Sequence, residues 1–312
     1  MKKIFIVAGR NSFDLAGRIS DKAKIELADV EWTNFSDGES KPQYKDNIRG
    51  ATLYIVNSTN APISNFDDVL LLADAAVRAS AKKVIVVIPY FGGQRQERKD
   101  KGRVPITAKL RATQLKAAGV YKIIAMDLHA DAIQAFAKRF DNIFASYLFV
   151  PYIKKLGLKN LIFASPDTGG TKRVEKYADH FGVEFNICYK QRSQGPNEIK
   201  QMRLLGDVRD KDVIVFDDMI DTAGSVELCV GLLKEKGAKS IRFFATHPVF
   251  SGKAYQRIKA MEDVKFVVTD TIPLKQEFTE LANIEVISID GLLAEVVKRD
   301  FRNESISSLF VF

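Results

Sequence analysis

The sequence predicts an α/β fold built from mainly parallel sheets, and three observations lead to this prediction. Short apolar runs rich in β-branched residues alternate with helical patterns along the 312 residues. Most of these runs are apolar throughout, as in strands that helices cover on both faces. In each half of the chain, one such run leads into a candidate ligand loop: residues 83–88 precede a glycine-rich loop, and residues 213–216 precede an acidic loop. Two similar doubly wound domains are therefore expected.

Eight runs are predicted as strands: residues 4–7, 52–57, 83–88, 122–126, 160–164, 213–216, 240–245 and 264–268. Helices are predicted at residues 69–81, 106–118, 171–181 and 225–236. Residues 64–67 have the pattern of a capping box before the first helix, and Pro105 suits the first turn of the second. Glycines at positions 119, 182 and 237 suit helix ends. The repeated pattern gives domains 1–146 and 147–312, and the extreme C-terminus is a candidate to pack back onto the first domain.

The composition indicates a packed chain that binds anions. Hydrophobic residues make up 46% and charged residues 28%, so a buried core is expected rather than disorder. The net charge of +8 suits phosphates, nucleotides or nucleic acid. The basic residues are dispersed, however, and no Lys/Arg run follows the pattern of a nucleic-acid-binding segment. Small anionic substrates explain the charge equally well.

Localisation follows from three features of the chain. Cys188 and Cys229 are far apart and in no metal-like spacing, so a reducing cytoplasm is expected rather than a disulfide scaffold. The apolar run near the N-terminus ends before Arg10, which is too short for a secretion signal and suits a buried strand. No apolar run approaches the roughly 20 residues that a membrane span needs.

The most informative stretch is residues 213–225. A buried strand pattern is followed by Asp217 and Asp218, then by Asp221 and a turn of small residues that opens a helix. Ligands of open α/β sheets bind at the carboxyl ends of strands, and N–H groups at a helix N-terminus suit a phosphate. The paired carboxylates suit ribose hydroxyls, or Mg²⁺ held through its waters. The structural alternative is an acidic turn that only caps the helix.

This stretch closely resembles the phosphoribosyl-diphosphate-binding motif that type I phosphoribosyltransferases share with ribose-phosphate diphosphokinases. Seven further segments resemble those of the diphosphokinases: residues 35–39, 89–99, 105–109, 127–130, 165–170, 246–249 and 305–310. The chain is therefore identified, from about residue 4 to its end, as a member of the ribose-phosphate diphosphokinase family. The resemblance implies two domains of type I phosphoribosyltransferase-like fold, with the first on the ATP side and the second on the ribose 5-phosphate side.

The resemblance also implies the reaction and its residues. The diphosphate of Mg·ATP would pass to the anomeric hydroxyl of ribose 5-phosphate, with Lys190 and Arg192 as catalytic cations. Implied ATP contacts are Phe35, Asp37, Gly38, Glu39, Arg95, Gln96, Lys99 and His129, and His129 and Asp167 are the implied metal ligands. The implied diphosphate loop is Asp167, Thr168, Gly169 and Gly170. Implied ribose 5-phosphate contacts are Arg192, Asp217, Asp218, Asp221, Thr222, Ala223, Gly224 and Ser225.

Assembly and regulation rest on the same resemblance. It implies a homo-oligomer, commonly a hexamer with a dimer as building unit, whose ATP site is completed by a neighbouring subunit. Phosphate activation and ADP inhibition would involve Arg49, Arg103, Ser305, Ser307 and Phe310. The chain departs from the family pattern at positions 47, 97, 191, 193–195 and 225; the changes at 191 and 193–195 are expected to slow turnover or alter loop closure, and Asn47 stands where serine is common among the regulated relatives.

Each functional interpretation has a structural alternative. Residues 95–99 alone would suit a solvated charged loop, His129 a structural histidine at a strand end, and Asp167 a helix cap. Two other functions also remain open. A phosphoribosyltransferase would use the acidic motif but would leave residues 35–39 and 95–99 unexplained. A non-catalytic regulatory relative would be expected to lose the metal ligands and the loop cations, and these residues are present.

Overall fold

The computed structural model describes residues 3–192 and 199–312, and of residues 190–192 and 199–201 it describes the backbone alone. The chain divides into two compact units. The first comprises Met1–Ala145, Thr271–Pro273 and Ile289–Phe310, and the second comprises Ser146–Asp270, Leu274–Ser288 and Val311–Phe312. None of the helices within the described ranges combines the length and apolar character that a membrane span requires.

The first unit contains a five-stranded sheet whose neighbouring strands are all parallel. In spatial order the strands are β1 (Ile4–Ala8), β4 (Thr52–Val56), β5 (Lys83–Ile88), β6 (Lys122–Met126) and β7 (Phe140–Ile143). Its helices are α1 (Phe13–Ala23), α2 (Ser64–Arg78), α3 (Thr107–Ala117) and α9 (Asp290–Arg302), with short 3₁₀ turns at Arg10–Ser12, Asp131–Phe136 and Ser307–Leu309. A separate antiparallel hairpin consists of β2 (Val30–Asn34) and β3 (Ser40–Tyr44).

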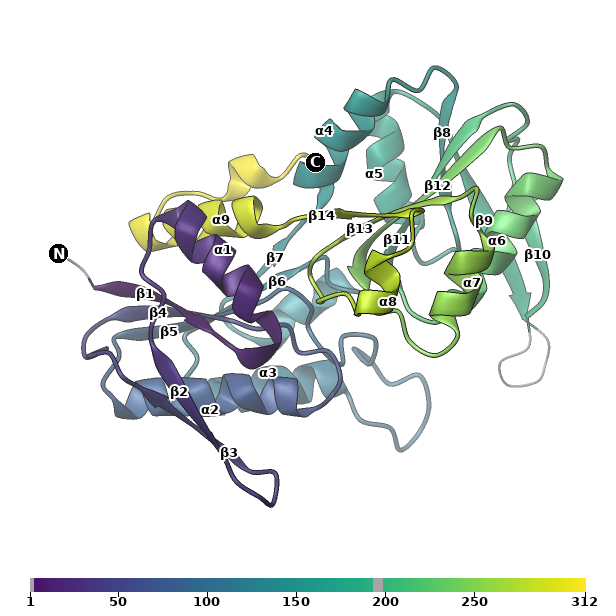
Figure 1. Cartoon of the computed structure of the whole chain (residues 1–312). Helices are drawn as coiled ribbons and strands as arrows, with labels where there is room; N and C mark the ends of the chain where they lie inside the picture. The colour runs from purple at the N-terminus through teal and green to yellow at the C-terminus, as the bar shows by residue number, and fades with distance from the viewer. Residues whose placement is uncertain (1–2, 193–198) are drawn as a thin grey trace. The chain divides into compact units, whose positions relative to one another are not determined.

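Both faces of this sheet are covered, which explains why its strands are apolar throughout. Successive side chains of a strand point to opposite faces. Phe5 and Val7 join the cluster formed with α2 and α3, which leaves the buried Ile6 on the other face. Figure 1 shows α2 and α3 on one side of the sheet and α1 with α9 on the other. The unit is therefore a three-layer, doubly wound sandwich.

The second unit contains a seven-stranded sheet. In spatial order its strands are β10 (Ile199–Leu205), β9 (Phe185–Arg192), β8 (Leu161–Ser165), β11 (Asp212–Ile220), β12 (Ser240–Pro248), β13 (Lys265–Thr269) and β14 (Ile284–Ile287). All neighbours are parallel except β9 and β10. Its helices are α4 (Ser146–Leu156), α5 (Thr171–Phe181), α6 (Gly224–Glu235), α7 (Ala254–Ala260) and α8 (Gln276–Thr279).

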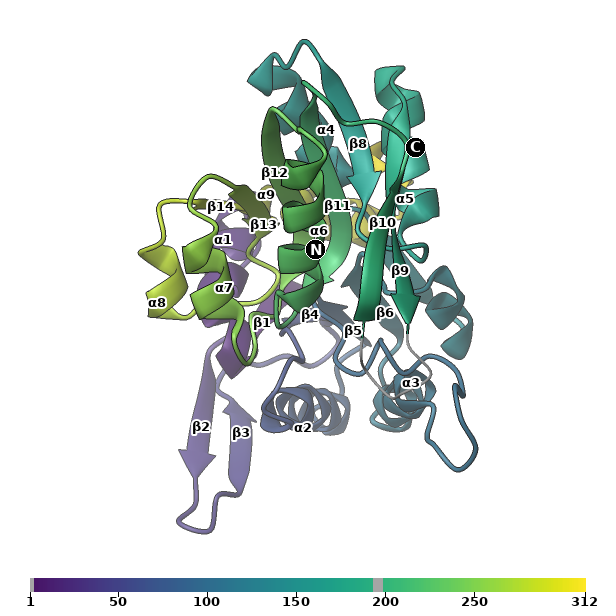
Figure 2. The same ribbon diagram turned by 90° about the vertical axis from the view of Figure 1, so that its right-hand side faces the viewer.

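The two faces of this second sheet are packed differently. One face buries a mixed cluster of aliphatic side chains and phenylalanines under α6 and α7, with Phe243 and Phe266 on the strands, and Figure 2 shows α6 lying along that face. Cys188 and Cys229 meet in this core with their sulfur atoms 3.2 Å apart and form no disulfide. The other face is aromatic: Phe216 stacks on Tyr177 of α5 with ring centroids 3.9 Å apart, and Phe244 meets Phe149 of α4 edge-on at 5.3 Å.

The predicted α/β fold with mainly parallel sheets is confirmed, and all eight predicted strands are present with small shifts of their bounds. The predicted capping box is wrong, because helix α2 begins at Ser64 after the N-cap residue Ile63, and no side chain caps it. Pro105 lies before α3 rather than in its first turn. Strands β2, β3, β7, β9, β10 and β14 were not among the predicted strands, because they are short, polar or at sheet edges.

Helix α9 is attached to the first unit by a network of charged and polar side chains. Asp300 accepts hydrogen bonds from the Tyr54 hydroxyl and the Lys122 ammonium, each at 2.6 Å, and Lys122 also pairs with Asp141 at 2.5 Å. Burial alone would lower the pKa of Lys122, but the two carboxylates outweigh it and raise the pKa. The ammonium is therefore held in its charged form between α9, β6 and β7.

We expect Asp300→Ala to lower the free energy of unfolding by about 2–3 kcal/mol, because it leaves a half-buried lysine with one fewer partner and a buried tyrosine without an acceptor. Urea denaturation measures the change. Asp74→Ala is the control, since it removes an exposed ion pair with Arg78 on α2 and should leave the unfolding midpoint unchanged. Equal effects of the two substitutions would contradict the proposed anchoring.

Candidate functional site

The carboxylates of the acidic motif lie at the end of β11 in the second unit. Asp218 is buried, and its backbone N–H donates to the Asp217 carboxylate at 2.9 Å. Although part of Asp217 remains accessible, burial raises the pKa of its carboxyl well above the ordinary value, and the negative charges of Asp218 and Asp167 raise it further. Arg173 acts in the opposite direction. At Asp217, burial and the neighbouring carboxylates therefore outweigh the effect of Arg173.

Asp167 follows β8, which pairs in parallel with β11, so the two acidic segments follow neighbouring strand ends. Its Oδ1 atom accepts hydrogen bonds from the backbone N–H groups of Gly169 and Gly170, at 2.9 and 3.1 Å. These are the N–H groups that the sequence predicted for a diphosphate, and here they donate to the loop's own carboxylate. Arg173, on the helix that follows, approaches Asp218 to 3.9 Å.

The predicted phosphate turn, Asp221 to Ser225, lies between β11 and α6. Ala223 adopts a left-handed conformation with φ of 57°, and the helix begins at the next residue, Gly224. The first N–H groups of a helix have no acceptor within the helix, and they lie at the positive end of its dipole. The turn therefore has the features of an anion-binding site.

A second segment, between β12 and α7, holds this turn in place. Ser251 donates from its hydroxyl to the Asp221 carboxylate at 2.5 Å and from its backbone to the Asp221 carbonyl at 3.0 Å. Arg257 donates to the Thr222 carbonyl at 2.8 Å. Neither Ser251 nor Arg257 was predicted from the sequence, although the adjacency of β11 and β12 indicates that the segments after them meet.

In the first unit, the glycine-rich loop after β5 packs closely on the chain beneath it. A Cβ atom on Gly92 would lie 2.0 Å from the Thr59 carbonyl oxygen, so no larger residue fits there. The fully buried Gln94 accepts a hydrogen bond from the backbone N–H of His129 at 3.1 Å, which connects the loop after β5 with that after β6. Gln94 was not predicted, and it brings the predicted ATP-side residues Arg95 and His129 to the same end of one sheet.

The residues before His129 are also held by side chains. Asp127 accepts a hydrogen bond from the backbone of Ala145 at 2.9 Å, and Asn142 accepts one from the backbone of Leu128 at 3.1 Å. Gln96 in the neighbouring loop is hydrogen-bonded to Thr107, the first residue of α3. These contacts fix the backbone, while the side chains of Arg95, Lys99 and His129 remain exposed.

The predicted adenine-contact segment forms the tip of the β2–β3 hairpin. Its turn is closed by the Phe35 N–H, which donates to the Glu39 carbonyl at 2.9 Å, and by the Asp37 carboxylate, which accepts from the Glu39 N–H at 3.0 Å. Gly38 supplies a φ of 95°. Phe35 is 46% exposed, which is unusual for a large aromatic residue. The hairpin projects away from the sheet of its own unit (Figures 1 and 2).

The residues predicted for regulation are all in the first unit. Ser305 and Ser307 share a hydrogen bond of 3.1 Å, Phe310 packs edge-on against an aromatic ring, and Arg49 and Arg103 are exposed.

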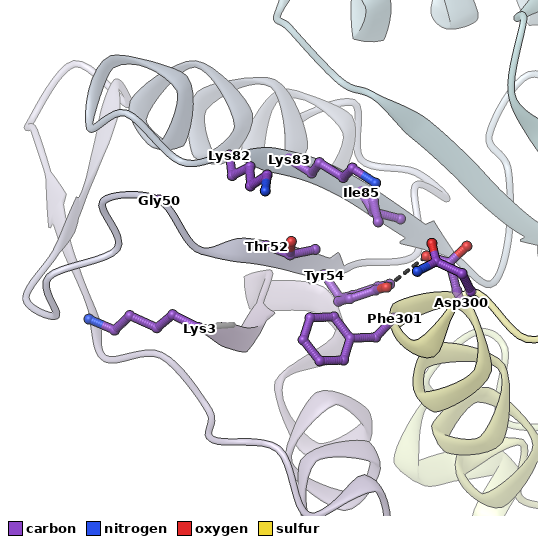
Figure 3. Close-up of a pocket in the computed structure, with 10 residues that line it drawn as sticks. Lys3, Gly50, Thr52, Tyr54, Lys82, Lys83, Ile85, Asp300 and Phe301 are labelled. Atoms are coloured by element: carbon purple, nitrogen blue, oxygen red, sulfur yellow. Dashed lines mark hydrogen bonds between the residues drawn. The ribbon is translucent and has the colours of Figure 1, made fainter. Parts of the chain in front are cut away.

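A pocket in the first unit lies elsewhere. Its lining includes Lys3, Lys82, Lys83 and Asp300 (Figure 3). Lys83 is the first residue of β5, so the pocket lies at the amino ends of the parallel strands. The loops that carry Arg95 and His129 follow the opposite ends, and the pocket is therefore distinct from the ATP-side loops.

The predicted catalytic cations belong to strand β9, whose backbone pairs antiparallel with β10: Lys190 opposes Met202, and Arg192 opposes Ile199. The side chains of Lys190 and Arg192 lie outside the described part of the structure, as do residues 193–195 of the altered loop.

Comparison with known proteins decides the family. A family model described as the N-terminal domain of ribose phosphate pyrophosphokinase matches residues 4–119, and a model described as the phosphoribosyl synthetase-associated domain matches residues 183–311. Together they cover most of the chain. The chain belongs to the ribose-phosphate pyrophosphokinase family.

Individual relatives agree with this assignment over the full length. The ribose-phosphate pyrophosphokinase of Campylobacter jejuni is 44% identical and is matched over 100% of both chains. That of Porphyromonas gingivalis is 42% identical, over 98% of this chain and 97% of the relative. Among solved structures, the phosphoribosylpyrophosphate synthetase of Mycobacterium smegmatis superimposes with a TM-score of 0.90 at 33% identity, over 97% of this chain and 100% of that chain. The resemblance and the fold class inferred from the sequence are confirmed.

The charge accumulation at the pyrophosphokinase acidic motif predicts a gain of stability when one charge is removed. Because the pKa of Asp217 is raised in the folded protein, its favourable contribution is complete below its ordinary pKa of 3.8 and is lost as the pH rises. We expect Asp217→Asn, without ligands or divalent cations, to melt at a higher temperature than the parent at neutral pH.

The difference in melting temperature should shrink as the pH falls towards 4, because the parent carboxyl is then protonated. Scanning calorimetry across this pH range measures it. Glu262→Gln, an exposed charge removal in the same unit, serves as the control. A variant that melts below the parent at neutral pH would show that the Asp217 charge stabilises the folded protein.

Proposed function

We propose that this protein transfers the β,γ-diphosphate of Mg·ATP to the anomeric hydroxyl of ribose 5-phosphate, giving 5-phosphoribosyl 1-diphosphate and AMP. Full-length relatives named ribose-phosphate pyrophosphokinase support this activity. The single observation that carries it is the second unit's acidic strand end, directly followed by an anion-binding helix start. A sugar phosphate carries hydroxyls and a phosphate in the same order.

The acceptor would bind along this strand end and turn. Its 5-phosphate would receive hydrogen bonds from the N–H groups at the start of α6 and from the hydroxyls of Thr222 and Ser225. Its ribose hydroxyls would donate to Asp217 or Asp218, which are acceptors when ionised. Hydroxyl donors stabilise the charged form of a carboxylate, so binding would oppose the burial and the repulsion that raise the pKa of Asp217.

The acidic strand ends also fit Mg²⁺. Asp167, Asp217 and Asp218 interact electrostatically, and at Asp217 their effect and that of burial outweigh Arg173. Within the described residues no three acidic, His or Cys side chains come together as a metal site, so the ion would take its other ligands from water and substrate phosphates. His129 and Asp167 are the proposed protein ligands. When bound, the ion would neutralise charge on the diphosphate.

The donor would bind to the first unit. Arg95 and Lys99 offer exposed cations for the phosphates, and Gln96 offers an amide, at the end of the sheet that also carries His129. The Phe35–Glu39 tip projects from its own unit, and its exposed ring suits contact with an adenine. We propose that a neighbouring copy of the chain completes the ATP site in a homo-oligomer. The expected form is a hexamer built from dimers, and the expected location is the cytoplasm.

The chemistry would be an in-line displacement. The anomeric oxygen forms a bond to the β-phosphorus as the bond from that phosphorus to the α-phosphate oxygen breaks, and AMP leaves. Holding both substrates in line supplies much of the acceleration. Lys190 and Arg192 would neutralise the charge that develops on the transferring group. A loose transition state needs little help from a general base, and none is assigned.

The other two functions account for less of the chain. A phosphoribosyltransferase would use the second unit's turn but would leave the hairpin tip and the Arg95 loop without a role. A non-catalytic relative would not need to retain the carboxylates at the ends of β8 and β11. Phosphate activation and ADP inhibition through Arg49, Arg103, Ser305, Ser307 and Phe310 are proposed as a regulatory property of the assembled enzyme.

The reaction products provide the test of function. Protein mixed with ATP, Mg²⁺ and ribose 5-phosphate should convert ATP to AMP and produce a sugar diphosphate. Phosphorus NMR detects both products. Formation of ADP would mean transfer of a single phosphoryl group and would contradict the proposal. Absence of any reaction would favour the non-catalytic relative.

Lys190→Ala should lower turnover by about 10²–10³-fold, the usual effect of losing one group that stabilises transition-state charge. Steady-state kinetics with saturating substrates measures it. Lys176→Ala on α5, which removes a lysine from the same unit with no assigned role, is the control for folding and net charge. Turnover near the parent value in Lys190→Ala would remove Lys190 from the mechanism.

A further inference from the structure

The guanidinium of Arg257, on helix α7, contacts the phosphate turn between β11 and α6. Arg257 Nη1 donates to the Thr222 carbonyl at 2.8 Å, and Nε pairs with the Glu227 carboxylate of α6 at 3.0 Å. A Cβ atom built on Gly224 would lie 3.1 Å from the same Nη1. One side chain therefore contacts the turn before, at and after the start of α6.

The phosphate turn needs this support, because its backbone conformation is unfavourable for its own sequence. Ala223 holds a φ of 57°, which is unfavourable for a residue with a side chain. An anion cradle also gathers N–H dipoles that repel each other while the site is unoccupied. The turn can persist only if surrounding contacts hold it.

The segment before Arg257 contacts the first half of the same turn. Phe250 donates from its backbone to the Ile220 carbonyl at 3.0 Å, and Ser251 holds both the backbone and the carboxylate of Asp221. Arg257 supplies the contacts to the second half. Residues 250–257 thus hold the turn from the side of β12. Within this segment, Arg257 contacts the end of the turn where α6 begins.

We propose that Arg257 is a positioning residue for the sugar-phosphate acceptor: through the Thr222 carbonyl it holds the turn in the conformation that binds the 5-phosphate. This inference rests on the proposed function and adds a residue to it. Arg257 acts through the backbone, because its guanidinium already has two protein partners. A lysine would not replace it, since its single ammonium nitrogen lacks the planar fork of donors on separate nitrogens with which Arg257 reaches the Thr222 carbonyl and Glu227.

Kinetics of Arg257→Gln and Arg257→Lys test the proposal. Each variant should raise the KM for ribose 5-phosphate by about 10–100-fold, the range for losing a charge-assisted hydrogen bond. The KM for ATP should stay within about twofold, since ATP binding is assigned to the other unit. Lys259→Gln is the matched control, a cation on the same helix that lies over the Tyr255 ring, and it should behave as the parent.

Direct titration with ribose 5-phosphate separates this inference from the proposed function. If the parent neither binds ribose 5-phosphate nor forms AMP, the proposed function fails. If the parent does both and Arg257→Gln keeps the parent KM for ribose 5-phosphate, only the role of Arg257 fails. An equal rise in both KM values, with a lower melting temperature, would mean a general structural role and would also overturn it. If Arg257→Lys binds ribose 5-phosphate weakly but has the melting temperature of the parent, the positioning role of Arg257 is supported.

Discussion

The organisation of the second unit depends on like charges held at the ends of two neighbouring parallel strands. The adjacency of β8 and β11 brings Asp167 into electrostatic contact with the Asp217–Asp218 pair. A fold selected for stability alone would not place an ionisable group where burial and two neighbours raise its pKa. Ligand hydroxyls and a divalent cation would stabilise these carboxylates when they are bound. The protein without ligands is then destabilised by the repulsion between the carboxylates and by their burial.

The same topology explains how the site is supported. Parallel strands end at the same edge, so each loop after a strand lies beside the loop after its neighbour. In the second unit Ser251, on the loop after β12, supports the turn after β11, and Arg257 on the following helix α7 adds a second contact. In the first unit Gln94, after β5, holds the backbone of His129, after β6. In both, the residue that supports the site lies on the neighbouring loop rather than beside the functional residue in the sequence.

This explains what could and could not be predicted from the sequence. Continuous apolar runs identified the central strands, and the acidic motif after the 213–216 run predicted a turn that opens a helix, which the structure has at the start of α6. Hairpin strands such as Val30–Asn34 escaped because their polar composition resembles a loop. Arg257 and Gln94 escaped because only the order of strands in the sheet reveals their partners. The hydrogen bonds from Gly169 and Gly170 to Asp167 were also not foreseen, since a glycine-rich turn looks the same whether its N–H groups await a ligand or face a carboxylate.

The central claim is that Asp217 and Asp218 accept hydrogen bonds from the hydroxyls of a sugar whose phosphate binds to the neighbouring turn. The most direct measurement is calorimetric binding of ribose 5-phosphate and 2-deoxyribose 5-phosphate, with Mg²⁺, to the parent and to a protein carrying Asp217→Asn and Asp218→Asn. The parent should bind the ribose compound about 10–100-fold more tightly, the usual range for one hydrogen bond to a charged group. The doubly substituted protein should bind both compounds equally. Equal affinity in the parent, or a preference that survives the two substitutions, would contradict the account.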